Sequence, residues 1–134
     1  MLVVDDETDI RDGSDRILTR AGFRVSKASR GQEALDIIDR QPVSIVFLDL
    51  KMPGMDGIDL LRFVKEENRP EEVIIVTAFG SLDTAREALS LGVADYITKP
   101  FKKEQIIYTV DRAMGRQRLK RDADRMAEIF EMEP

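Results

Sequence analysis

Three carboxylates, one hydroxyl and one ammonium in this sequence each follow an apolar run that is typical of a buried strand. They are Asp5, Asp6, Asp49, Thr77 and Lys99. Other nucleophiles and bases are scarce, because the 134-residue chain contains no Cys and no His. That composition excludes disulfide scaffolds, thiolate zinc sites, cysteine nucleophiles and histidine-based triads. Chemistry must be carried by carboxylates, Lys, Tyr and hydroxyls.

Clustered carboxylates need a positive charge close to them. At about 4 Å and an effective dielectric constant near 20, two carboxylates repel each other by on the order of 4 kcal/mol. A hard divalent cation, Mg²⁺ in particular, suits such an all-oxygen cluster, and Lys99 would supply a second, fixed cation. Asp49 could then attack phosphorus, since carboxylates form aspartyl-phosphate intermediates. Thr77 could donate a hydrogen bond to a phosphoryl oxygen.

Each of these residues also has an ordinary structural interpretation. Asp5 and Asp6, taken singly, fit helix N-caps. Thr77 alone fits a strand or cap residue, and Lys99 alone fits a solvated surface charge. Asp49 is harder to explain in this way, because it directly follows a buried strand. The functional interpretation therefore depends on whether the fold brings the five side chains together.

The elements that must position these residues alternate along the chain. Apolar runs predict strands at residues 2–4, 23–25, 43–48, 73–76 and 93–97. Helical periodicity predicts a first helix with Thr8 or Asp9 as N-cap and Gly22 just past its end. The further predicted helices cover 31–40, 57–68 and 81–91, and a fifth begins near 102. This alternation predicts an α/β fold with a doubly wound parallel sheet between two helical layers.

In such a sheet, ligands collect outside the carboxyl ends of the strands, where the strand order reverses. All five candidate residues would then share one rim. The segment 51–57 after Asp49 is typical of a rigid turn, because Pro53 fixes its φ angle and Gly54 and Gly57 can take positive φ. Its backbone carbonyls are available as neutral metal ligands.

The last twenty residues, 115–134, are mostly charged and carry an apolar stripe. Leu119, Ala123, Met126 and Phe130 follow one another at spacings of four, three and four. This pattern predicts a helix, either continuous with the preceding one or separate from it. A solvated tail and a dimerising or linker helix fit it equally well.

Charge and hydropathy limit the partners. The 21 Lys and Arg residues against 26 Asp and Glu residues give a net charge of −5, which argues against direct nucleic-acid binding through phosphate contacts. No apolar run approaches the roughly 20 residues of a membrane span, and the N-terminus lacks a signal-peptide pattern. We expect one soluble, cytoplasmic domain without membrane contact.

In this order and at these separations, four motifs resemble the receiver domain of two-component response regulators. They are Leu2-Val3-Val4-Asp5-Asp6-Glu7, Asp49 with Met52-Pro53-Gly54-Met55-Asp56-Gly57, Thr77-Ala78, and Gly92-Val93-Ala94-Asp95-Tyr96-Ile97-Thr98-Lys99-Pro100-Phe101. The resemblance covers about residues 1–114. It implies a flavodoxin-like, five-stranded parallel sheet of strand order 2-1-3-4-5, followed by a helical linker or C-terminal extension at 115–134.

The resemblance also implies a role for each residue of the rim. Asp49 would accept phosphate from a sensor histidine kinase, and Thr77 and Lys99 would contact the phosphoryl group. The Mg²⁺ ligands would be Asp5, Asp6, Asp49 and the backbone carbonyl of Lys51. Tyr96 would be the switch aromatic that turns inward when Thr77 is drawn to the phosphate. That movement would remodel the face made by the fourth helix, fifth strand and fifth helix.

The stretch 80–88 and the charged tail are similar to receivers of the NtrC class of sigma54-dependent activators. In these proteins a helical linker leads to an ATPase and a DNA-binding domain, and neither output domain is present in this chain. The resemblance therefore implies control of an output domain or partner, with transcription as the regulated process. It also allows a homodimer through the remodelled face or through the C-terminal helix.

Three other functions fit parts of the pattern. A haloacid-dehalogenase-like phosphatase would place its nucleophile in a D-x-D pair after the first strand, which Asp5-Asp6-Glu7 does not provide. A flavin-binding module would bring its phosphate against the same carboxylates, which would repel it. A pseudo-receiver, which binds without phosphorylation, usually lacks one of the acidic residues or the Lys. We expect a phosphoacceptor regulatory domain that is not an enzyme, with the pseudo-receiver as its main alternative.

Overall fold

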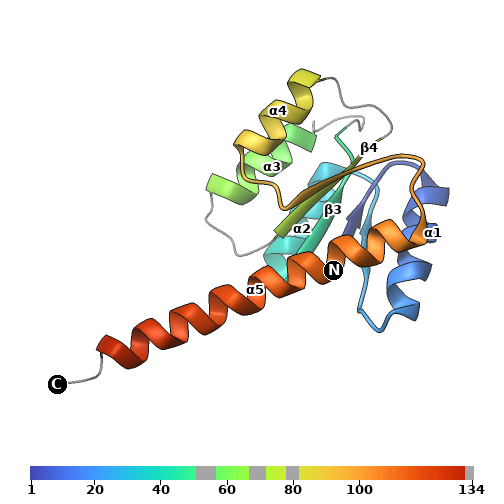
Figure 1. The fold of residues 1–134 in the computed structure, drawn as a ribbon. Helices are drawn as coiled ribbons and strands as arrows, with labels where there is room; N and C mark the ends of the chain where they lie inside the picture. Colours follow the sequence, from blue (N-terminus) through green and yellow to red (C-terminus); the bar gives the residue numbers. More distant parts are fainter. Residues whose placement is uncertain (51–56, 67–71, 78–81, 132–134) are drawn as a thin grey trace.

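A computed structural model describes residues 1–50, 57–66, 72–77 and 82–131 of the chain (Figure 1). In these residues, five strands form one sheet of order β2-β1-β3-β4-β5, and every neighbouring pair is parallel. The strands are β1 Leu2–Val4, β2 Ser26–Ala28, β3 Ile45–Leu48, β4 Glu72–Thr77 and β5 Asp95–Thr98. The helices are α1 Thr8–Arg20, α2 Gly31–Arg40, α3 Gly57–Glu66, α4 Leu82–Ser90 and α5 Lys103–Glu131. The predicted fold class and strand order are confirmed.

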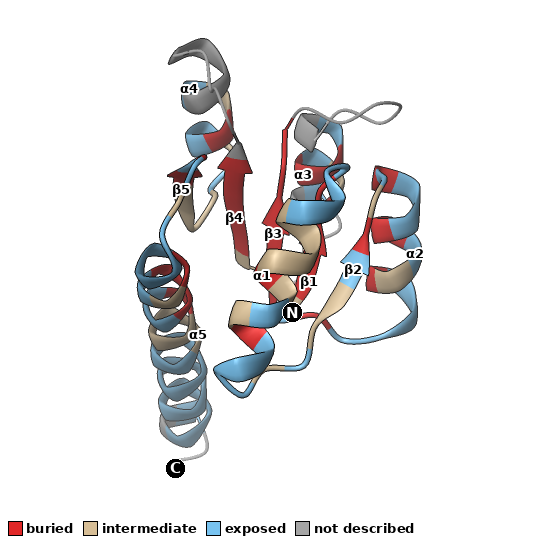
Figure 2. Cartoon of the chain, turned by 90° about the vertical axis from the view of Figure 1, so that its right-hand side faces the viewer, coloured by how far each residue is buried: buried red, intermediate tan, exposed pale blue. Residues whose placement is uncertain are grey.

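Alternation along the strands divides the core into two layers of side chains. Leu2 and Val4 of β1 pack with α2 and α3 on one face of the sheet, whereas Val3 packs with α1 and α5 on the other. The central strands β1 and β3 are therefore covered on both sides, which explains why their sequences are apolar at every position. Figure 2 shows the buried strands between the two helical layers. In these central strands, polar side chains can be placed only where the strands end.

The second strand lies three residues later than predicted. The apolar pair Phe23 and Val25 belongs to a connecting loop and packs at the margin of the core, while β2 begins at Ser26. The reason is pairing: β2 is an edge strand, and its register is set by β1, with Ser26 opposite Leu2. The end of the preceding helix is as predicted, since Gly22 takes a φ of 96° just after Ala21 caps α1.

The beginning of α1 also differs from the prediction. The N-cap is Glu7, not Thr8 or Asp9, and no side chain caps the helix. The backbone N–H of Glu7 instead donates to Asp5 Oδ1 at 2.9 Å. The chain therefore turns from β1 into α1 around the Asp5 carboxylate, which ties the helix start to the predicted site.

The fifth helix runs without a break from Lys103 to Glu131, so the predicted tail helix continues the preceding one. Gln117 Nε2 donates to the Ser44 carbonyl at 2.6 Å, and Arg116 donates to the Ala94 carbonyl at 3.3 Å. Beyond these contacts the helix leaves the sheet, and residues 118–129 are exposed (Figure 2). That residues 115–134 serve as a linker or extension stays a prediction. None of the helices in the described ranges is long and apolar enough to cross a membrane.

Candidate functional site

Asp5 and Asp49 lie side by side because β1 and β3 are neighbours in register. Val4 lies opposite Leu48, so the residue after each strand emerges at the same edge of the sheet. Backbone hydrogen bonds continue the ladder, with Asp5 N donating to the Ala28 carbonyl and Asp49 N donating to the Val4 carbonyl. Both aspartates are almost completely buried, at 2% and 4% exposure. The end of the sheet thus holds two carboxylates away from bulk water.

Lys99 reaches these carboxylates from the far side of β4. It directly follows β5, and its side chain is only 7% exposed. Its Nζ lies 2.7 Å from Asp5 Oδ2 and 3.3 Å from Asp49 Oδ2, and it donates to both. The strand order makes this contact achievable, since β1, β3, β4 and β5 all end at one rim. A buried cation therefore faces two buried anions.

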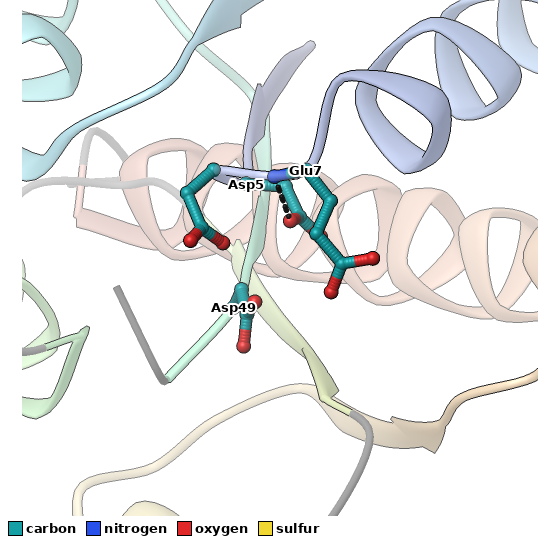
Figure 3. A group of neighbouring side chains, drawn as sticks. Asp5, Glu7 and Asp49 are labelled. Atoms are coloured by element: carbon teal, nitrogen blue, oxygen red, sulfur yellow. Dashed lines mark hydrogen bonds between the residues drawn. The ribbon is translucent and has the colours of Figure 1, made fainter. Parts of the chain in front are cut away.

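Asp6 and Glu7 complete an acidic cluster with Asp5 and Asp49. One carboxylate oxygen from each of the four residues lies within 4.8 Å of all the others. Asp6 and Glu7 are exposed, so the cluster is open to solvent on one side. Figure 3 shows Asp5 and Glu7 leaving the loop after β1, with Asp49 at the end of β3.

This donor set fits Mg²⁺. The ion prefers oxygen ligands and is usually held by one or two carboxylates together with waters and phosphate oxygens. Four carboxylates against the single charge of Lys99 leave a formal excess of three negative charges (4 − 1 = 3) within the cluster. A divalent cation would reduce that excess, so its binding relieves repulsion that the fold itself creates.

Burial is the largest influence on the pKa values of Asp5 and Lys99. It raises the pKa of Asp5 above the usual aspartate range, and this effect outweighs the hydrogen bonds from Lys99 and from the Glu7 backbone. Burial by itself would lower the pKa of Lys99. The hydrogen bond to Asp5 and the charges of Asp5, Asp49 and Glu7 overcome it, so the Lys99 pKa is raised. Lys99 is therefore a fixed cation at neutral pH.

The structure brings four of the predicted site residues together: Asp5, Asp6, Asp49 and Lys99. The backbone of Thr77 ends β4 opposite Thr98, next to the same rim; its side chain lies outside the described part of the structure. The Lys51 carbonyl and the turn at 52–56 also lie outside it. The functional roles of all these residues stay predictions at this point.

Tyr96 lies in β5 and is half-buried against the core layer that contains α2 and α3. Its hydroxyl oxygen is buried and, among the described residues, has no hydrogen-bond partner. Burial raises the pKa of this phenol. An unsatisfied buried hydroxyl favours movement to a position where it is bonded. The role of Tyr96 as the switch aromatic stays a prediction.

Glu7 is the site residue that the sequence analysis missed. The sequence pattern predicts no role for it beyond its place next to Asp5 and Asp6. The turn around the Asp5 carboxylate brings it within 3.6 Å of Lys99 Nζ. Its place directly after two acidic residues was the available signal, but an exposed Glu at a helix start is common and favoured for other reasons.

Comparison with known proteins gives a consistent result. Residues 1–111 match the family model of the response regulator receiver domain. The chain is 38% identical over 106 residues to sporulation initiation phosphotransferase F of Bacillus subtilis, covering 79% of this chain and 86% of that protein. It is 38% identical over 113 residues to the DNA-binding transcriptional regulator NtrC of Klebsiella pneumoniae, covering 84% of this chain and 24% of that protein.

The crystal structure of NtrX from Brucella abortus is similar, with a TM-score of 0.88 and 35% identity over 94% of this chain and 29% of that one. The chain thus spans about a quarter of the length of NtrC and NtrX, and most of the length of the Bacillus relative.

If Asp5 is a Mg²⁺ ligand, the variant Asp5→Asn should lose the stabilisation that Mg²⁺ gives to the folded protein. Ligand binding to the folded state stabilises it by about 2.7 kcal/mol at a ligand concentration of 100 times Kd. We expect Mg²⁺ to raise the melting temperature of the wild type and to have almost no effect on Asp5→Asn, measured by calorimetry. The matched control is Asp122→Asn on the exposed part of α5. An equal gain in Asp5→Asn and wild type would exclude Asp5 as a ligand.

The gain in melting temperature from Mg²⁺ should also depend on pH. A raised pKa means that the folded state favours protonated Asp5, so its contribution to stability is present at low pH and is lost as the pH rises through that pKa. Mg²⁺ needs the ionised form. The Mg²⁺-dependent gain should therefore fade as the pH falls through the raised pKa of Asp5.

Proposed function

This chain belongs to the response regulator receiver domain family, and we propose that it is a phosphoacceptor switch in which Asp49 takes a phosphoryl group from a sensor histidine kinase. The observation that carries the proposal is the buried Asp49 carboxylate facing Lys99 Nζ at 3.3 Å within an acidic cluster. Neither a structural N-cap nor a solvated lysine accounts for this arrangement. The family itself is a regulatory one, so turnover of a substrate is not part of the function.

The proposed reaction is attack of an Asp49 carboxylate oxygen on phosphorus. The new O–P bond forms as the bond from phosphorus to the donor breaks, and the donor keeps that electron pair. Asp5, Asp6 and Asp49, with the carbonyl of Lys51, would hold Mg²⁺. When bound, the ion supplies positive charge to the phosphoryl oxygens.

Lys99 has a separate electrostatic role in the proposal. Its ammonium already touches Asp49, so it lies where negative charge increases when the phosphoryl group arrives. Its second partner, Asp5, would lose part of that interaction as Lys99 turns to the phosphoryl oxygens. Phosphorylation would thereby rearrange an ion pair that links β1 to β5.

The proposed switch passes from Thr77 through β5 to α5. Thr77 would donate to a phosphoryl oxygen, and Tyr96 would follow it inward. The residue before Tyr96 provides a connection: Asp95 accepts from the Tyr96 N–H, and its other oxygen lies 3.5 Å from Arg112 Nη1 on α5. A displacement of β5 would therefore be transmitted to the helix that leaves the domain.

The proposed output is regulation of transcription by a further domain or partner. Support comes from the similarity to NtrC, of which this chain spans 24%. The face formed by α4, β5 and α5 would be the surface whose shape depends on phosphorylation. Direct contact with nucleic acid or membrane is not part of the proposal, and a cytoplasmic location stays a prediction from the sequence.

A homodimer is the second part of this proposal. Among the described side chains of the exposed half of α5, Leu119, Met126 and Ile129 are large and apolar, at 70%, 55% and 51% exposure. Leu119 and Met126 are seven residues apart and so lie on one side of the helix. Pairing with the same stripe of a second copy would remove these side chains from water.

The phosphoacceptor is tested by intact-mass spectrometry after incubation with Mg²⁺ and acetyl phosphate. The wild type should gain one phosphate in the presence of the metal, and Asp49→Ala should gain none. Asp111→Ala, on the exposed side of α5, is the control that keeps the whole site and should behave as wild type. Phosphate on Asp49→Ala would refute the assignment. No gain by folded wild type would favour a pseudo-receiver.

The dimer is tested by sedimentation velocity of a double variant, Leu119→Gln with Met126→Gln. Gln keeps a good helix propensity, so α5 should stay helical while its apolar stripe is lost. We expect the wild type to associate as its concentration rises and the double variant to do so less. Arg118→Gln with Arg125→Gln is the matched control. A wild type that stays monomeric, or equal association of all three proteins, would contradict the tail as a dimer contact.

A further inference from the structure

Glu7 differs from the two buried carboxylates of the acidic cluster, Asp5 and Asp49, in its exposure. Its side chain is 58% exposed, whereas those of Asp5 and Asp49 are 3% and 5% exposed. Its Oε1 lies 3.6 Å from Lys99 Nζ, so it is the third carboxylate around that cation. Glu7 therefore lies on the exposed side of the cluster, with Asp6, while its backbone adjoins Asp5 (Figure 3).

The position of Glu7 is fixed by its backbone. Its N–H donates to Asp5 Oδ1, and its carbonyl accepts from the Arg11 N–H in the first turn of α1. The Glu7 side chain makes no capping hydrogen bond, although Glu7 is the N-cap residue. Replacing the carboxylate by an amide of the same shape therefore leaves the fold of this loop intact. What changes is one negative charge at the entrance of the site.

A negative charge at this place has opposite effects on the two species that must enter. It attracts a divalent cation, since metal affinity in oxygen sites rises with the number of charged ligands. It repels a small anionic phosphoryl donor, and it competes with the incoming phosphoryl oxygens for the Lys99 ammonium. Asp5, Asp6 and Asp49 cannot change the charge of the site without loss of function, because the proposed chemistry uses them as metal ligands and phosphoacceptor.

We propose that Glu7 is a specificity-determining residue that tightens divalent-cation binding and slows phosphoryl transfer from small anionic donors. This inference rests on the proposed function, because it concerns donor access to Asp49. Glu7 helps to position the Lys99 ammonium and changes the electrostatic potential that an entering cation or donor meets. It is not a catalytic residue, because it does not contact the reacting atoms.

The test uses Glu7→Gln and two independent readouts. Titration calorimetry with Mg²⁺ should show an affinity about three- to tenfold weaker than wild type, the range expected for one exposed charge near a divalent ion. At saturating Mg²⁺, the rate of phosphate gain from acetyl phosphate, followed by intact mass, should rise about two- to fivefold. Opposite changes in affinity and rate distinguish an electrostatic role from structural damage, which would lower both.

Two control variants separate position from charge. Asp9→Asn removes one negative charge from the first turn of the same helix but outside the acidic cluster, and both readouts should stay at wild-type values. Glu7→Asp keeps the charge and should also stay close to wild type. The differences in Mg²⁺ affinity and in transfer rate between wild type and Glu7→Gln should shrink in 1 M salt. The reason is that the Debye length falls from about 10 Å at 0.1 M to about 3 Å at 1 M.

The outcomes of this test are distinct. Unchanged Mg²⁺ affinity in Glu7→Gln, or a transfer rate that falls or stays the same, would overturn the inference while wild-type phosphorylation of Asp49 upholds the proposed function. If the wild type takes no phosphate at all, the proposed function fails and the donor half of the inference fails with it. In that case, titration calorimetry with Mg²⁺ still tests whether Glu7 tightens cation binding.

Discussion

The contact of the Lys99 ammonium with the buried carboxylates of Asp5 and Asp49 is the interaction on which the rest of the site depends. Two carboxylates at the end of a sheet cannot both stay ionised and buried without a neighbouring cation. Lys99 provides it through a side chain that crosses the end of β4. One ion-pair network thereby joins three strands and leaves enough excess negative charge to bind a divalent ion.

The apolar sheet makes this network achievable. Its central strands β1 and β3 are covered on both faces, so polar groups can be placed there only at the strand ends. The parallel arrangement brings all the carboxyl ends to one rim, and the register of β1 against β3 sets Asp5 beside Asp49. The same constraint gives β5 two functions: it delivers Lys99 to the rim, and through Asp95 it contacts Arg112 of α5. A change at Asp49 therefore has a short route to the helix that leaves the domain.

Much of this could be predicted from the sequence because strong local signals agreed with one another. Strand–helix alternation predicted the sheet. Asp5 and Asp49 each directly follow a predicted strand, and Lys99 lies two residues beyond the end of the fifth one. The second strand was misplaced because Ser26–Ala28 is a polar edge segment that is defined by its pairing with β1 and not by its own hydropathy. Glu7 was missed for a related reason. Its role depends on how the chain turns around Asp5, which composition and spacing do not encode.

The central claim is that Asp49, and no other carboxylate of the cluster, forms the bond to phosphorus. Borohydride converts an aspartyl phosphate to homoserine, and cleavage after Arg40 and Lys51 yields a peptide of residues 41–51 whose only acidic residue is Asp49. After incubation with acetyl phosphate, mass spectrometry should find homoserine in this peptide when Mg²⁺ is present and not when it is chelated. Homoserine in the peptides that contain Asp5 or Asp6, or none in residues 41–51 of a protein that has taken phosphate, would contradict the account.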